Sequence, residues 1–157
     1  GKKSTVVIKP SELDTGINFV RTDVNNNNQI KAIWYNVTST VLSTTISNKD
    51  NVSVSTIEHL MSALFGMHID NANILINGPE IPIMDGSSRP FVELFEQAGI
   101  STQNAHRKMI KVNKEVEVCI EDKFLKISPN SEFSLDFEID FKTSISLTEI
   151  LPSASAM

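Results

Sequence analysis

The spacing of apolar residues along the chain changes between a strand-like and a helix-like period, and it outlines the secondary structure. In many segments apolar residues alternate with polar ones or form short runs between turn-forming Pro, Gly, Asn and Asp residues. This pattern is typical of strands. The predicted strands are 4–9, 17–22, 30–36, 39–46, 71–77, 108–113, 115–121, 123–128 and 132–140.

Two segments follow the helical period instead. Ser55 and Glu58 have the spacing of a capping box, and the apolar positions after them predict a helix at 55–67. A second stripe, with a proline near its start and a glycine at its end, predicts a helix at 88–98. The order of elements predicts an α+β fold with both helices packed on antiparallel sheet. The residues expected to pack there are Ile57, Leu60, Met61, Leu64, Phe65, Phe91, Leu94 and Phe95.

Composition narrows the class of protein. The 157 residues suit a single domain, and 40% of them are hydrophobic, as in ordinary globular proteins. The net charge of −5 argues against a nucleic-acid partner, which needs a basic surface. Because Cys119 is the one cysteine, the chain has no internal disulfide, and this composition fits a reducing compartment. No apolar run reaches the ~18 residues of a membrane span.

His59 is the histidine with the most informative position. In a helical projection it lies opposite the apolar stripe, on a face with Ser62, Ala63 and Gly66. Small uncharged residues let a ligand or another backbone approach closely, so we expect the imidazole to face something outside its own core. The capping box alone accounts for Glu58, however, and a lone helical histidine is more often a simple surface residue. The spacing leaves both interpretations open.

The other histidines and a proline-rich segment carry weaker signals. His68 follows the first predicted helix and His106 lies in a basic connection, so we expect both to be solvated. A catalytic zinc site usually needs three protein ligands, and the sequence does not supply an obvious set of three. Asp85 opens a turn among three prolines. It indicates either a turn that feeds a helix cap or a rigid loop beside an active site.

Two long motifs resemble those of a known enzyme family. The first is Ser55 to Leu64 (STIEHLMSAL) with 69–72 (IDNA), and the second is Gly78 to Ser87 (GPEIPIMDGS). Their sequences and mutual spacing are similar to those of the bacterial UDP-3-O-acyl-N-acetylglucosamine deacetylases, zinc enzymes of lipid A biosynthesis. The resemblance extends from Gly1 to about Phe141 through shorter matches: Thr15-Gly16, 19–23 (FVRTD), 133–137 (FSLDF) and 139–141 (IDF).

The resemblance implies a fold, a cofactor and residue roles. In that family two similar α+β halves form a ribosomal-S5-domain-2-like sandwich with the active site between them. The first motif assigns the general base to Glu58 and a Zn²⁺ ligand to His59, while Asp85 would belong to a supporting loop. The substrate would be UDP-3-O-acyl-N-acetylglucosamine, in the cytoplasm of a Gram-negative bacterium. The residues that line the substrate site would be Leu42, Ser43 and Thr44.

The chain also departs from the family pattern. The family's second half supplies another zinc histidine, an aspartate ligand, a lysine and a histidine acid, for which this sequence has no counterparts. Residues 1–141 would therefore be the N-terminal domain without its first strand, and 142–157 a divergent, disordered tail. The zinc site would be incomplete, the chain alone would be inactive, and its partner would be the missing second half. A non-catalytic α+β interaction module is the alternative from a different class.

Overall fold

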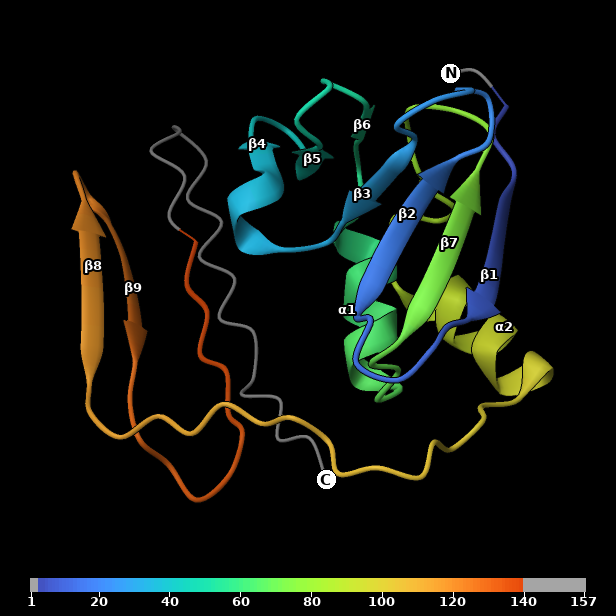
Figure 1. Cartoon of the computed structure of the whole chain (residues 1–157). Coiled ribbons are helices and arrows are strands. Elements are labelled where there is room, and N and C mark those ends of the chain that lie inside the picture. The colour runs from blue at the N-terminus through green and yellow to red at the C-terminus, as the bar shows by residue number, and fades with distance from the viewer. Residues whose placement is uncertain (1–2, 140–157) are drawn as a thin grey trace. The chain divides into compact units, whose positions relative to one another are not determined.

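The computed structural model describes residues 3–139, and the chain divides into two compact units, 1–107 and 108–157. The first unit is built on a sheet with the strand order β1-β7-β2-β3 (Figure 1). β1 and β3 pair antiparallel with their neighbours, as the sequence predicts, but β2 and β7 run parallel, so this sheet is mixed. Parallel neighbours need a long crossover, which runs here through α1. The strands are β1 (Val6–Pro10), β2 (Ile17–Arg21), β3 (Gln29–Lys31) and β7 (Ala72–Ile76).

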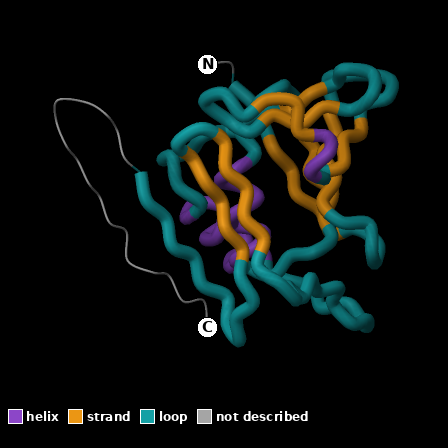
Figure 2. Tube along the Cα trace, turned by 90° about the vertical axis from the view of Figure 1, so that its left-hand side faces the viewer, coloured by secondary structure: helices purple, strands orange, loops and turns teal. Residues whose placement is uncertain are grey.

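Two helices, α1 (Glu58–Gly66) and α2 (Arg89–Ala98), lie on one face of this sheet. In Figure 2 both helices lie to the left of the strands of this sheet. Alternate residues of β7 are buried against the helices, as expected for a strand with one face in the core. The prediction of two helices packed on a sheet is thus confirmed. The buried core includes the predicted residues Ile57, Leu60, Leu64, Phe91 and Phe95 and the strand residues Phe19, Ile30, Ile74 and Ile76.

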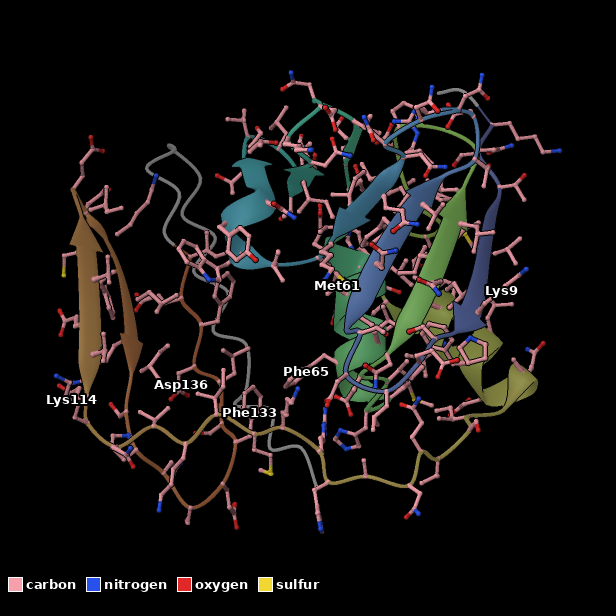
Figure 3. The ribbon with its side chains drawn as sticks, in the orientation of Figure 1. Lys9, Met61, Phe65, Lys114, Phe133 and Asp136 are labelled. Carbon is pink, nitrogen blue, oxygen red and sulfur yellow. The ribbon has the colours of Figure 1, made fainter. Side chains whose placement is uncertain are left out.

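The buried stripe of each helix is narrower than the sequence predicts. Phe65 and Leu94 are 61% and 51% exposed, so the expectation that both pack in the core was wrong. Ala63, which was expected on the outer face, is buried, because α1 approaches the core through this small residue and its leucine neighbours. Met61 is partly buried against the core and projects with Phe65 from the side of α1 away from α2 (Figure 3).

A small second sheet has the order β4-β5-β6 and replaces two predicted strands. The predicted strand 30–36 ends at Lys31, because the Asn36 side chain donates to the Lys31 carbonyl at 2.9 Å and a 3₁₀ helix follows. The predicted strand 39–46 is interrupted at Leu42, whose φ of 64° is incompatible with extended pairing. The elements are η1 (Trp34–Asn36), β4 (Val37–Ser39), β5 (Thr45–Ser47) and β6 (Ser53–Val54).

The second unit contains one described hairpin, β8 (Val116–Ile120) and β9 (Lys123–Ile127). These two strands confirm the strands predicted at 115–121 and 123–128, and the two-residue turn between them has Glu121 at a φ of 56°. The predictions of strands at 108–113 and over the described part of 132–140 were wrong, since neither segment has a ladder partner among residues 3–139. Residue 140 and the predicted tail at 142–157 lie outside the described residues. None of the described helices has the length and apolar character needed to cross a membrane.

Candidate active site at the start of α1

The first turn of α1 carries both candidate catalytic side chains and is tied to the loop before β5. Glu58 and His59 are its first two residues, and both are half-buried. The Thr44 backbone N–H donates to Glu58 Oε2 at 3.0 Å, while the Ile57 N–H donates to the Thr44 carbonyl at 3.4 Å. Glu58 Oε1 receives no hydrogen bond from a described residue. The carboxylate is therefore held by one oxygen, and the other remains able to accept a proton.

The predicted capping box was wrong. The helix begins at Glu58, and the residue at its N-cap is Ile57, which has no side chain able to cap. The Ser55 hydroxyl donates instead to the Pro79 carbonyl at 3.2 Å, while the Glu58 carboxylate is engaged by Thr44. These long-range bonds satisfy the two side chains better than the local motif does. Capping therefore does not account for Glu58.

The segment that enters α1 is fixed to the segment after β7. Ser55 and Glu80 form an isolated parallel bridge. In this bridge the Ser55 N–H donates to the Pro79 carbonyl at 2.8 Å, and the Ile81 N–H donates to the Ser55 carbonyl at 3.1 Å. Ile81 is fully buried in the core. The bridge thus joins the entry of α1 to a buried anchor.

Arg21 attaches the same region to the main sheet. Its side chain, only 11% exposed, donates from Nε and Nη2 to the two carboxylate oxygens of Asp23 at 2.8 Å each. These bonds lower the pKa of Asp23. The third nitrogen, Nη1, donates to the Ser53 carbonyl in β6 at 2.6 Å. Arg21 therefore links the end of β2 to the strand that leads into α1.

His59 presents its ring without a hydrogen bond to another described residue. The neighbouring outward positions Ser62 and Gly66 are exposed, as the helical projection predicts. The third position predicted for that face, Ala63, is in the core. The imidazole thus lies on an uncharged surface of small residues, where a ligand or a second polypeptide has steric access.

A catalytic zinc ion would need more ligands than the start of α1 supplies. Catalytic zinc takes three protein ligands and keeps one open position. Within residues 3–139, no group of three His, Cys, Asp or Glu side chains is placed to hold a metal ion. His59 is a suitable ligand type, and Glu58 beside it is a suitable base, but they supply one ligand. The described residues do not form a complete zinc site.

The loop before β5 carries the residues expected to line the substrate site. Leu42 is fully exposed at its positive φ, and Ser43 and Thr44 are half-buried. The structure brings Thr44 to Glu58 through the hydrogen bond described above. Leu42 and Ser43 directly precede Thr44 in the chain. The loop therefore lies beside Glu58. That Leu42, Ser43 and Thr44 line the substrate site remains a prediction.

Asp85 lies in the turn before α2. The N–H and hydroxyl of Ser87 donate to Asp85 Oδ1 at 2.9 and 2.8 Å, and the Ser87 hydroxyl accepts from the Arg89 N–H at 3.2 Å. The hydrogen bonds from Ser87 lower the pKa of Asp85. Among the described residues, no hydrogen bond joins Asp85 to Glu58 or His59. The hydrogen bonds between Asp85 and Ser87 stabilise the turn that leads into α2. The expected role of Asp85 in a loop that supports the active site remains a prediction.

The Asp85 turn gives a pH-dependent prediction. A carboxyl whose pKa is lower in the folded state stabilises that state above its unfolded pKa of ~3.9, and this contribution is lost as the pH falls through the folded value. We expect Asp85→Asn to lower the Tm modestly at pH 7, with a gap to the parent that narrows as the pH falls below ~3.9. Thermal unfolding across this range measures the gap.

The matched control removes the donor instead of the charge. In a Ser87→Ala background, Asp85→Asn should have a smaller effect at pH 7, because the hydroxyl that binds the carboxylate is absent. A difference in Tm between parent and Asp85→Asn that is the same at pH 7 and pH 3 would contradict this explanation.

One contact near the candidate site was missed by sequence reasoning. The Thr56 hydroxyl donates to Glu80 Oε1 at 2.9 Å, and Thr56 is buried with a φ of 58°. Both residues lie in the motifs that carry the family resemblance. A single sequence holds no signal that pairs two positions 24 residues apart.

Comparisons with known proteins identify the same enzyme family as the two sequence motifs. The family model described as UDP-3-O-acyl N-acetylglycosamine deacetylase matches residues 1–152. The UDP-3-O-acyl-N-acetylglucosamine deacetylase of Shewanella pealeana is 48% identical over 141 residues, which cover 90% of this chain and 46% of that protein. The protein of the same name from Vibrio cholerae is 46% identical with the same coverage. The chain thus spans about half the length of the curated relatives it matches, and it belongs to the UDP-3-O-acyl N-acetylglycosamine deacetylase family.

Proposed function

We propose that this chain supplies the general base, Glu58, and one zinc ligand, His59, to a deacetylase of lipid A biosynthesis. The substrate is UDP-3-O-acyl-N-acetylglucosamine, the molecule in the names of the relatives. The remaining ligands come from a second, similar α+β half that completes a ribosomal-S5-domain-2-like sandwich. We place the reaction in the cytoplasm, where nucleotide sugars are available.

The observation that carries this proposal is the arrangement at the start of α1. Glu58 and His59 are adjacent, half-buried and outside the apolar core, and the Thr44 N–H holds one Glu58 oxygen at 3.0 Å. This hydrogen bond fixes the carboxylate while Oε1 can accept a proton. A general base must be held in position to be effective, and the hydrogen bond from Thr44 supports this role for Glu58.

The chemistry is amide hydrolysis. Zinc, when bound, polarises the acetyl carbonyl and makes water more acidic. Glu58 takes a proton from the attacking water, whose oxygen forms a bond to the acetyl carbon. The C–N bond then breaks, and a separate acid from the second half protonates the amine as it leaves. The products are acetate and the free amino sugar nucleotide.

Zinc binding by the chain alone should be weak. A single imidazole does not hold catalytic zinc tightly, and residues 3–139 offer no three-ligand group. In equilibrium dialysis of the 157-residue chain against Zn²⁺, we expect no stoichiometric binding at micromolar metal. The variants His59→Ala, His68→Ala and His106→Ala serve as a matched set. Tight binding that is lost only in His59→Ala would contradict this expectation and indicate a site completed by a second copy of the chain.

The proposed function is tested by acetate release. The chain is joined to the second half of the Shewanella pealeana relative, and acetate is measured with UDP-3-O-acyl-N-acetylglucosamine as substrate. We expect release by the completed protein and none by the chain alone. A folded, zinc-loaded completed protein that releases no acetate would refute the deacetylase function and leave the non-catalytic module as the better account.

A further inference from the structure

We propose that Glu80 is a positioning residue for the catalytic turn, acting through its hydrogen bond with Thr56. This inference rests on the proposed function of Glu58 and His59, and it adds a residue for which neither composition nor motif suggested a role. Thr56 lies two residues before the proposed base, is buried, and has an unfavourable backbone conformation. Its hydroxyl is bound by the carboxylate of Glu80, which comes from a distant segment of the chain.

Thr56 occupies a conformation that a β-branched residue rarely adopts. Its φ is 58°, in the left-handed region, and its side chain is buried. Such a conformation persists only where the surrounding structure enforces it, and it is concentrated at functional sites. Among residues 3–139, the Thr56 side chain makes one hydrogen bond, which its hydroxyl donates to Glu80 Oε1 at 2.9 Å. A bond to an ionised carboxylate is among the stronger hydrogen bonds in proteins, so it is well suited to hold this residue.

Glu80 is itself held firmly. Its carbonyl accepts a hydrogen bond from the Ser4 hydroxyl at 3.0 Å, and its backbone is bridged to Ser55. Prolines flank it closely on both sides, and Ile81 is fully buried. Glu80 is exposed, but its carboxylate extends from a fixed backbone segment to the Thr56 hydroxyl, and we infer that it helps to hold Thr56 in place.

The position of Thr56 controls that of Glu58. The backbone after Thr56 passes directly into Ile57 and Glu58, and both of these form hydrogen bonds with Thr44. The catalytic turn is thus fixed between Glu80 and Thr44. Loss of the Glu80 contact would let Thr56 relax towards negative φ, which rotates the next peptide units and displaces the Glu58 carboxylate. Displacement of a catalytic group by about 1 Å can reduce turnover on the order of 100-fold.

Four variants of the completed enzyme test the inference by kinetics. Glu80→Ala and Thr56→Val remove the hydrogen bond, and we expect kcat to fall at least about tenfold with KM changed less than about twofold. Glu80→Gln and Thr56→Ser keep an acceptor and a hydroxyl, and should retain kcat within about threefold. Equal losses in Glu80→Ala and Glu80→Gln, or a parental kcat in Thr56→Val, would overturn the inference.

Amide hydrogen exchange in the 157-residue chain provides a test that does not need activity. The Thr44 N–H is protected by Glu58 Oε2, so Glu80→Ala and Thr56→Val should raise its exchange rate about tenfold or more. The Ile74 amide in β7 serves as the internal control, and its rate should not change. A Thr44 rate that matches the parent, or a uniform rise at Thr44 and Ile74, would overturn a positioning role.

The two tests separate this inference from the proposed function. If Glu58→Gln leaves the completed enzyme fully active, the proposed role of Glu58 as the base fails, whereas the exchange result still decides whether Glu80 positions Glu58. If Glu58→Gln abolishes turnover while Glu80→Ala leaves kcat and the Thr44 exchange rate unchanged, only the positioning role fails.

Discussion

Glu58→Gln in the completed enzyme should reduce turnover by about 10²–10⁴-fold while zinc content stays at the parental level. General bases contribute rate factors of this size, and the glutamine amide cannot accept the proton of the attacking water. Its carbonyl oxygen can still accept the Thr44 N–H, so the first turn of α1 should keep its conformation. Acetate release at saturating substrate measures the turnover, and metal analysis of the same sample measures the zinc.

The control for this prediction is His59→Ala, which should lose zinc and activity together. The two variants thus distinguish loss of the base, which leaves zinc bound, from loss of a zinc ligand, which does not. A folded, zinc-loaded Glu58→Gln enzyme that hydrolyses the substrate at the parental rate would show that Glu58 is not the base. Its carboxylate would then serve only to bind the Thr44 amide.

Leu60→Ala should lower the free energy of unfolding of the chain by about 3–5 kcal/mol, the cost of a cavity under a fully buried leucine. Leu94→Ala on α2 removes the same atoms from a residue that is 51% exposed, and should cost less than about 1 kcal/mol. Urea unfolding of both variants and the parent gives the two values, with the m-value as a check on the transition.

This pair tests the burial pattern that differs from the sequence prediction. The apolar stripe placed Leu60 and Leu94 equally in the core, whereas the structure buries only Leu60. Equal losses of stability in the two variants would contradict the packing of α2 described here.

Elements governed by local pattern could be predicted from the sequence. β7 has a short apolar run between polar residues, and α2 has a strongly one-sided stripe between a proline and a glycine. Both formed within two residues of the predicted bounds. The turn at 48–51 also has a local origin, because the Asn48 side chain accepts the N–H groups of Asp50 and Val52.

Features that depend on distant contacts could not be predicted. The capping box at Ser55 failed because Pro79 and Thr44 compete for the two side chains, and neither competitor is visible in a local window. The strand predicted at 39–46 failed because the chain turns at Leu42 to reach the start of α1. The identity of the candidate site came from the family motif, while the Thr56–Glu80 contact needed the fold.

The most direct test of the central claim is zinc-edge anomalous diffraction from crystals of the completed enzyme. We expect a single strong peak at bonding distance from a ring nitrogen of His59, with the Glu58 carboxylate beside it and the other ligands in the second half. A zinc peak whose ligands do not include His59 would contradict the claim that the start of α1 forms part of the catalytic centre.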